Sequence, residues 1–248
     1  MKPVRLLLFD VDGTLIRCGA QVRPILSGVL TEVFGTCGDM EGFEFSGKTD
    51  QQIVLELLCG AGLPRERVRA GLSRLRELYL ERLEERLDRE RMELLPGVEQ
   101  LLAELAARPG VALGLLTGNW EGGARIKLSR FGLDRYFDFG AFGEDGVERP
   151  ELLPVALERA FRATGRRFAP EEALIVGDSV RDVDCARAHG VPVWGVTTGW
   201  TPAERLAAAG ADRVVASLAG LAAELAGAAA APRLQLRAPR GPTDAVRR

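Results

Sequence analysis

The sequence predicts an α/β fold in which a parallel sheet carries helices on both faces and an all-helical segment follows the first strand. A short apolar run at residues 4–9 has the length and composition of a strand buried on both faces. After about residue 96, strand-like apolar runs alternate with helical patterns, which is typical of a parallel sheet. Residues 17–91 show the helical period alone, so they add no strand to the predicted sheet.

The composition is that of a globular protein without an electrostatic preference for polyanions. Of the 248 residues, 46% are hydrophobic and 27% are charged, and the net charge is −2. We therefore expect a soluble enzyme that acts on a small molecule, with no nucleic acid and no membrane as partner, and a monomer or homodimer. The four cysteines lack CxxC spacing, and neither a signal peptide nor an apolar run of about 18 residues is present, which predicts a cytoplasmic protein.

Three helices are expected in the segment that follows the first strand. Apolar residues recur there at helical spacing over residues 21–34, 51–58 and 64–87. The third of these helices has Arg and Glu residues of mixed sign on its outer face, which indicates a surface exposed to solvent.

From residue 98 onward, helices and strands are expected in alternation. The predicted helices span residues 98–107, 123–131, 151–164, 180–189, 201–209 and 218–226, and the predicted strands span 111–116, 137–142, 173–176, 192–196 and 213–215. Such alternation builds a Rossmann-like sheet that binds ligands at the carboxyl ends of its strands. We expect Thr201 to cap the helix at 201–209. Residues 228–248 are poor in large apolar side chains and are expected to be a disordered tail.

Two carboxylates stand directly after the first strand. Asp10 and Asp12 lie two residues apart, before the turn signal Gly13-Thr14. At the period of a strand they leave its end on the same side, and two like charges held close together are costly without a cation or a shared proton. A solvated turn is the alternative for such a motif in isolation. Because His189 is the only histidine, carboxylates are expected to carry the proton transfer.

Two further strand ends carry polar groups. After the strand at 111–116, Thr117 offers a hydroxyl and a backbone N–H to a phosphate oxygen, Gly118 lets the backbone approach, and Asn119 adds an amide donor. An ordinary loop with a helix cap is the alternative there. Asp178 ends the strand at 173–176, and Asp182 follows on the first helical turn, where the helix dipole alone would also favour a carboxylate.

The segments FDVDGTL, LLTGN, RP and IVGDSVRD resemble, in order, the four motifs of the haloacid dehalogenase superfamily, most of whose members are Mg-dependent phosphohydrolases. The resemblance covers about residues 4–226. It implies that Asp10 is the nucleophile that becomes an aspartyl-phosphate and that Asp12 is the general acid and base. It also implies Mg²⁺ bound by Asp10, Asp178 and the backbone carbonyl of Asp12, with Asp182 beyond the direct ligands.

The third motif of the superfamily normally supplies a lysine. The matching position here is Arg149, which also neutralises charge and can bridge a carboxylate and a phosphate. Lys127 competes for this role, but its spacing places it on the body of a helix, so we favour Arg149. An exposed arginine before a proline-started helix is the alternative.

In the superfamily, a helical insertion at this place is a cap that closes over the active site. The resemblance therefore divides the chain into a catalytic core of residues 1–16 and 92–227 and a cap of residues 17–91. Within the cap, the sequence GKTD resembles a loop of phosphoglycolate-phosphatase-like members that faces the active site, so Lys48 would meet a substrate anion. The alternative is that Thr49 or Asp50 only caps the next helix.

These features predict a Mg²⁺-dependent phosphatase of a small metabolite, such as phosphoglycolate or a sugar phosphate. Phosphoryl transfer needs a nucleophile in line, a cation at the phosphate oxygens and a proton shuttle at the leaving group. The predicted substrate-binding residues are Thr117, Gly118, Asn119, Arg149 and Lys48. A phosphomutase of the β-phosphoglucomutase type shares the motifs. Phosphonatases lack a carboxylate at the position of Asp12, and a non-catalytic binding domain would be expected to lose Asp10 or Asp12.

Overall fold

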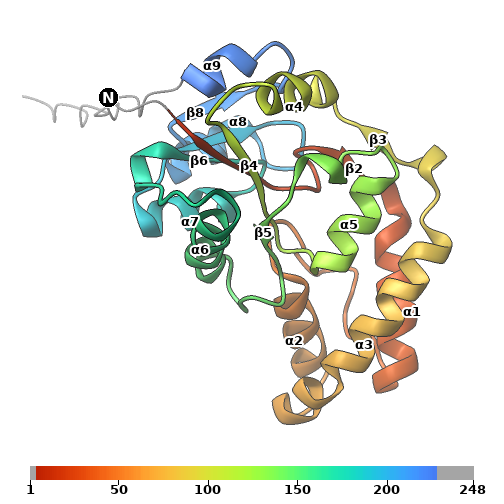
Figure 1. Ribbon diagram of the computed structural model, residues 1–248. Coiled ribbons are helices and arrows are strands. Elements are labelled where there is room, and N and C mark those ends of the chain that lie inside the picture. The colour runs from red at the N-terminus through yellow and green to blue at the C-terminus, as the bar shows by residue number, and fades with distance from the viewer. Residues whose placement is uncertain (1–3, 228–248) are drawn as a thin grey trace, which may run out of the picture.

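The computed structural model describes residues 4–227, which fold around a six-stranded parallel sheet (Figure 1). The predicted sheet with helices on both faces is confirmed. In spatial order, its strands are β5 (Gly140–Ala141), β4 (Ala112–Leu116), β1 (Leu6–Phe9), β6 (Ala173–Gly177), β7 (Val193–Val196) and β8 (Arg213–Val215).

The first strand lies in the middle of the sheet, and both of its faces are buried. Leu7 and Phe9 belong to one apolar cluster, while Leu6 and Leu8 belong to a second cluster on the opposite face. This alternation follows from the strand period of two, and it explains why the first strand reads as an unbroken apolar run.

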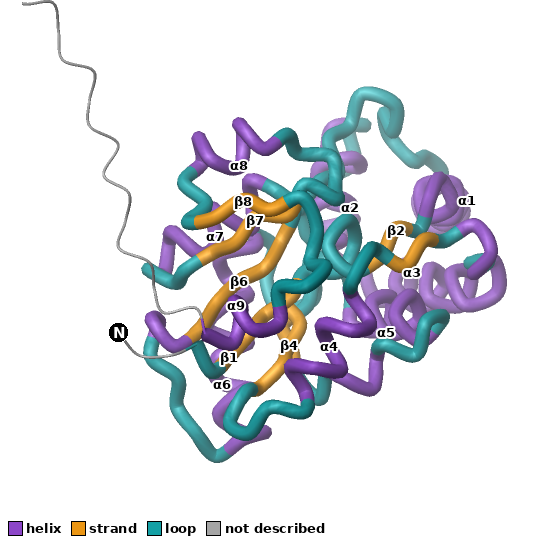
Figure 2. Tube along the Cα trace, turned by 90° about the horizontal axis from the view of Figure 1, so that it is seen from above, coloured by secondary structure: helices purple, strands orange, loops and turns teal. Residues whose placement is uncertain are grey.

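Helices cover both faces of the sheet (Figure 2). Residues of α4 (Val98–Ala106) and α9 (Ala222–Gly227) join the first cluster. Residues of α6 (Leu152–Thr164), α7 (Val180–His189) and α8 (Ala203–Ala209) join the second. The strands therefore end between two helical layers, and their carboxyl ends meet at one edge of the core.

The insertion after β1 consists of α1 (Val22–Phe34), α2 (Asp50–Gly60) and α3 (Arg65–Arg86), which group beside the sheet in Figure 1. Its two ends are joined by an antiparallel ribbon of β2 (Ile16–Arg17) and β3 (Glu93–Leu94). This ribbon lies at the boundaries predicted for core and cap, and that division stays a prediction. The predicted tail, 228–248, lies outside the described residues.

Three local differences from the sequence expectations have physical reasons. Helix α5 (Glu121–Ser129) begins before Gly123 and includes Gly122, where a Cβ would lie 2.7 Å from the Leu80 side chain of α3. Strand β5 has two residues rather than six, because Gly140 and Ala141 are the residues that pair with β4. The predicted cap of α8 by Thr201 is wrong, because Pro202 is the N-cap and the helix makes no side-chain capping bond.

We expect the packing of α3 to be a main source of stability. Leu75 is fully buried, whereas Leu72 on the same helix is only partly buried. Leu75→Ala should lower the free energy of unfolding by about 2–5 kcal/mol, and Leu72→Ala by clearly less, because a cavity forms only in the first case. Urea denaturation of both variants checks this, and equal losses would contradict the packing described.

Candidate active site

The polar side chains predicted to form a site gather where three neighbouring strands end. Asp10 follows β1, Thr117 follows β4, and Asp178 follows β6. Because β4, β1 and β6 are adjacent and parallel, their carboxyl ends bring these residues to one place.

Three buried carboxylates form the centre of this place. Asp10, Asp178 and Asp182 each contribute an oxygen, and these oxygens all lie within 4.8 Å of one another. Two glycine positions enclose the Asp178 carboxylate: a Cβ at Gly13 would lie 2.6 Å from its Oδ2, and a Cβ at Gly199 would lie 1.6 Å from it. Gly13 also has a φ of +87°, which favours glycine. Larger residues at either position would displace Asp178.

Arg149 is the cation that faces this cluster. Its Nη2 lies 2.8 Å from Asp10 Oδ1 and 2.6 Å from Asp182 Oδ1, and it donates to the carbonyl of Leu116 at 2.7 Å. Only 2% of Arg149 is exposed, so it is not the exposed arginine of the alternative interpretation. Burial opposes the charged guanidinium, but the carboxylates of Asp10 and Asp182 raise the pKa of Arg149 above its usual value.

Asp182 has two functions in the structure. Its Oδ2 accepts hydrogen bonds from the N–H and the hydroxyl of Ser179, at 3.0 and 2.6 Å, which closes a capping box at the start of α7. Its Oδ1 faces Arg149. Both interpretations given by the sequence, a helix-start carboxylate and a participant in the site, therefore describe the same side chain.

The cluster carries more negative charge than Arg149 neutralises. Asp178 makes no ion pair with any residue in 4–227, and burial together with the charges of Asp10 and Asp182 raises its pKa well above the usual range. Burial also raises the pKa of Asp182, to about 6. Mg²⁺ binds carboxylate oxygens and would balance these charges, so the donor set fits this ion. A contribution of Asp12 through its backbone carbonyl stays a prediction.

The side chain of Asp12 contacts a different cation. Its Oδ2 accepts hydrogen bonds from Lys127 Nζ at 2.6 Å and from Asn119 Nδ2 at 2.9 Å. Lys127 lies on the body of α5, as predicted, and only 3% of it is exposed, whereas 31% of the Asp12 side chain is exposed. Although burial acts in the opposite direction, Lys127 and Asn119 lower the pKa of Asp12. Sequence reasoning considered Lys127 only as a rival of Arg149 and missed its contact with Asp12.

Thr117 and Asn119 contact each other at the end of β4. Thr117 Oγ1 accepts from the N–H of Asn119 at 3.3 Å and from its Nδ2 at 2.8 Å, which leaves the hydroxyl proton of Thr117 to donate elsewhere. The backbone N–H of Thr117 is not available to a phosphate, because it is bonded to Ala141 O in the sheet. The Asn119 side chain is directed to Asp12 and Thr117, and a contact with substrate stays a prediction.

The segment 46–50 of the insertion lies directly on the core. Asp50 N donates to Gly118 O at 2.7 Å, and Asp50 Oδ2 accepts from Trp120 N at 2.8 Å. Thr49 Oγ1 donates to Val147 O at 2.6 Å. Gly118 permits this approach, since a Cβ there would lie 2.1 Å from Lys48 O. The sequence did not reveal these contacts, because they join residues far apart in the chain.

The side chains of this segment bear on its two interpretations, a helix cap and a contact with the substrate. Thr49 caps α2, because its Oγ1 accepts from Gln52 N at 3.0 Å. Lys48 pairs with Glu56, and its Nζ lies 4.1 Å from the centre of the Phe43 ring. A contact between Lys48 and a substrate anion therefore stays a prediction, and it would require Lys48 to leave Glu56.

The ribbon that joins the insertion to the core is bonded to the loop over Asp178. Arg17 of β2 pairs with Glu93 of β3 and donates through Nε to the carbonyl of Thr198 at 3.0 Å. Thr198 Oγ1 in turn donates to Gly13 O at 2.7 Å. The next residue is Gly199, which lies against the Asp178 carboxylate. The sequence could have indicated this loop, because it follows the end of a strand, as Thr117 does.

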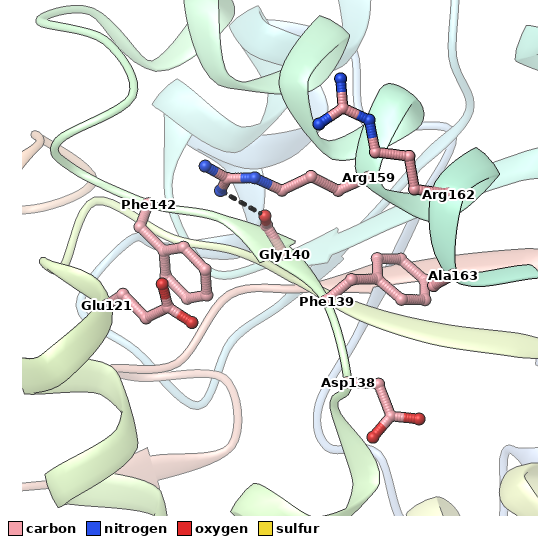
Figure 3. Close-up of a pocket in the computed structure, with 8 residues that line it drawn as sticks. All are labelled: Glu121, Asp138, Phe139, Gly140, Phe142, Arg159, Arg162 and Ala163. Atoms are coloured by element: carbon pink, nitrogen blue, oxygen red, sulfur yellow. Dashed lines mark hydrogen bonds between the residues drawn. The ribbon is translucent and has the colours of Figure 1, made fainter.

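A cavity of about 420 Å³ lies elsewhere, at the edge strand β5 (Figure 3). Arg159 crosses it and donates to Gly140 O at 2.8 Å. Its lining residues are Glu121, Asp138, Phe139, Gly140, Phe142, Arg159, Arg162 and Ala163. It includes none of the clustered carboxylates. His189 also lies outside the cluster of Asp10, Asp178 and Asp182. Its Nε2 lies 2.7 Å from Pro150 O.

Within residues 4–227, none of the helices combines the length and the apolar character that crossing a bilayer requires.

Comparison with known proteins gives one consistent result. The family model of haloacid dehalogenase-like hydrolases matches residues 7–196. Phosphoglycolate phosphatase 1 of Pseudomonas aeruginosa is 29% identical over 88% of this chain and 78% of its own length. The plasmid-encoded phosphoglycolate phosphatase of Cupriavidus necator is 31% identical over 93% of this chain and 96% of its own.

Solved structures share the fold. A protein described as a haloacid dehalogenase-like hydrolase from Bacteroides fragilis superposes with a TM-score of 0.66 at 25% identity, over 88% of this chain and 99% of its own. A hydrolase from Pseudomonas syringae superposes with a TM-score of 0.63 at 22% identity, over 90% of this chain and 97% of its own.

The acidic cluster generates a prediction about metal binding. At a Mg²⁺ concentration about 100 times its Kd, the ion should stabilise the protein by about 2.7 kcal/mol and raise its Tm by several degrees. Asp178→Asn should abolish this shift, whereas Asp138→Asn, which changes an exposed carboxylate in the β5 cavity, should retain it. Calorimetric melts with and without Mg²⁺ measure both, and a full shift in the Asp178 variant would contradict the assigned cluster.

Asp50 generates a prediction about pH. Burial raises its pKa from 3.8 to about 6 in the folded chain, so between these values the folded state holds a proton that the unfolded state has released. Wild-type stability should therefore fall as pH rises from 4 to 7, by up to about 2–3 kcal/mol relative to Asp50→Asn. Urea titrations across this pH range test it, with Asp138→Asn as the control that should follow wild type.

Proposed function

This chain belongs to the phosphatases of the haloacid dehalogenase-like hydrolase family, and we propose that it hydrolyses a small phosphate monoester, phosphoglycolate foremost, through an aspartyl-phosphate on Asp10. The relatives named phosphoglycolate phosphatase support the substrate class. The observation that carries the proposal is the setting of Asp10: it ends the central strand, beside two further carboxylates and the buried Arg149.

Asp10 is suited to attack phosphorus because one of its oxygens is fixed. Arg149 contacts Oδ1, so that the carboxylate keeps its orientation while the other oxygen bonds to the phosphorus atom. The same guanidinium lies beside the position that the phosphate oxygens would take. Thr117 would add a hydroxyl proton there, since within the described part of the chain its Oγ1 only accepts hydrogen bonds.

Asp12 is suited to move protons, because its charge is separated from that of Asp10. Two carboxylates in one motif can take different chemical roles when their surroundings differ. Asp10 faces Arg149, and Asp12 faces Lys127. In the first step Asp12 gives a proton to the leaving oxygen, and in the second it takes a proton from the water that attacks phosphorylated Asp10.

The residues that would hold Mg²⁺ are Asp10, Asp178 and the backbone carbonyl of Asp12. When bound, the ion neutralises charge on the transferring phosphoryl group. Asp182 would support the site through Arg149 and the capping box at Ser179.

The test is hydrolysis of phosphoglycolate, sugar phosphates, nucleotides and pyrophosphate by the purified chain with Mg²⁺. We expect net release of phosphate, fastest from phosphoglycolate. Asp10→Asn should lower kcat by about 10³-fold or more, because the nucleophile is lost. Asp138→Asn is the matched control. Phosphorylated Asp10 should be detectable by mass spectrometry after acid quenching.

Two results would count against the proposal. Full activity of Asp10→Asn would exclude the covalent step. Interconversion of sugar phosphates without net release of phosphate would instead identify a phosphomutase.

A further inference from the structure

We propose that Lys127 and Asn119 are positioning residues that anchor Oδ2 of Asp12, which leaves Oδ1 as the oxygen that exchanges the proton with the leaving group. This inference rests on the proposed function. Because Arg149 fills the position of the third motif, Lys127 has no role in that motif, and this inference gives it one.

The two carboxylate oxygens of Asp12 have unequal surroundings. Oδ2 accepts a charged hydrogen bond from Lys127 at 2.6 Å and a second bond from Asn119 at 2.9 Å. Among residues 4–227, Oδ1 accepts a hydrogen bond only from the thiol of Cys18, at 3.5 Å. Charge-assisted bonds are the stronger ones, and a thiol is a weak donor. Oδ2 is therefore fixed and Oδ1 is available.

Lys127 and Asn119 also orient each other. Lys127 Nζ lies 2.6 Å from Asn119 Oδ1, so the amide oxygen faces the ammonium group. The amide nitrogen is then directed to the acceptors, Asp12 Oδ2 and Thr117 Oγ1. With the reverse orientation, the amide N–H groups would face a cation, which is unfavourable. The three side chains therefore have one consistent arrangement.

The packing of α5 against α3 keeps Lys127 in place. The rings of Tyr79 on α3 and Trp120 before α5 meet edge to face at 5.5 Å. Gly122 lets the two helices come close, since a Cβ there would lie 2.7 Å from the Leu80 side chain, and Gly123 also faces α3. As a result Lys127 lies on the buried face of a helix that packs against α3, a setting that suits a positioning residue.

Lys127 does not duplicate Arg149. The ion pairs of Arg149 are with Asp10 and Asp182, and that of Lys127 is with Asp12. The charge of Lys127 favours the ionised form of Asp12, which suits the second step but not the first. Its benefit common to both steps is alignment, and a misplacement of about 1 Å can cost about 10²-fold in rate.

The proton transfer is balanced as follows. Asp10 forms a bond to phosphorus while the ester P–O bond breaks and leaves its electron pair on the leaving oxygen. That oxygen takes the proton from Oδ1 of Asp12. In the second step, water bonds to phosphorus, its proton goes to Oδ1, and the P–O bond to Asp10 breaks, which releases phosphate.

The test uses the leaving group. Phosphoglycolate leaves as an alkyl alcohol and needs the proton, whereas p-nitrophenyl phosphate leaves as a stable phenolate and needs it little. The readout is the ratio of kcat/KM for phosphoglycolate to kcat/KM for p-nitrophenyl phosphate. The decrease of this ratio in Asp12→Asn shows how large the effect of losing the proton donor is. Lys127→Met and Asn119→Ala should each lower the ratio by about 10- to 100-fold.

Arg125→Met is the matched control, because Arg125 lies on the same helix as Lys127. It donates to Phe137 O and to Glu121, and not to Asp10, Asp12, Asp178 or Asp182. This variant should leave the ratio unchanged. A purely structural effect in Lys127→Met would lower both activities equally and leave the ratio alone. A role in phosphate binding would raise KM for both substrates.

Each outcome decides the matter. If Asp12→Asn lowers the ratio but neither positioning variant does, this inference is overturned and the proposed function stands. If Asp12→Asn leaves the ratio unchanged, Asp12 is not the proton donor and this inference is overturned, while hydrolysis through Asp10 stands. If wild type hydrolyses neither ester, the proposed function fails and the inference with it. Should Lys127→Met not fold, Asn119→Ala decides alone.

Discussion

The repulsion among Asp10, Asp178 and Asp182 is the constraint on which the rest of the site depends. Of these three buried carboxylates, Arg149 pairs with those of Asp10 and Asp182 and not with that of Asp178, and burial without full pairing is among the costliest arrangements in a folded chain. Asp10 and Asp178 lie at the ends of β1 and β6, two adjacent strands in which every residue is buried. Gly13 and Gly199 lie directly against the Asp178 carboxylate. A divalent cation would relieve this repulsion, so the feature that costs stability is also the one that fits a metal ion.

The second organising feature is the separation of Asp10 and Asp12. Two residues apart on one strand end, they could compete for one counter-ion, yet each has its own. The two cations come from different elements, Lys127 from α5 and Arg149 from the turn before α6. The strand fixes the carboxylates, and the helices around it differentiate them chemically.

The fold could be predicted from the sequence because its signals are local. The apolar run of β1 and the alternation after residue 96 identify the sheet, and the strand ends identify the polar loops. Lys127 is a case that the sequence predicts only in part. Its place on a helix follows from the local pattern, but its contact with Asp12 joins residues 115 positions apart. The contacts of Asp50 with the core are equally nonlocal. Gly122 is a related case, since only the nearness of Leu80 explains a glycine inside α5.

The contacts of Arg17 have a mechanical consequence. This side chain joins both strands of the ribbon to the Thr198 carbonyl, and Thr198 is bonded to the backbone beside Asp178. A swing of the helical insertion about the ribbon must therefore either drag that loop along or rupture those bonds. Arg17 therefore connects the helical insertion mechanically to the loop that encloses the Asp178 carboxylate.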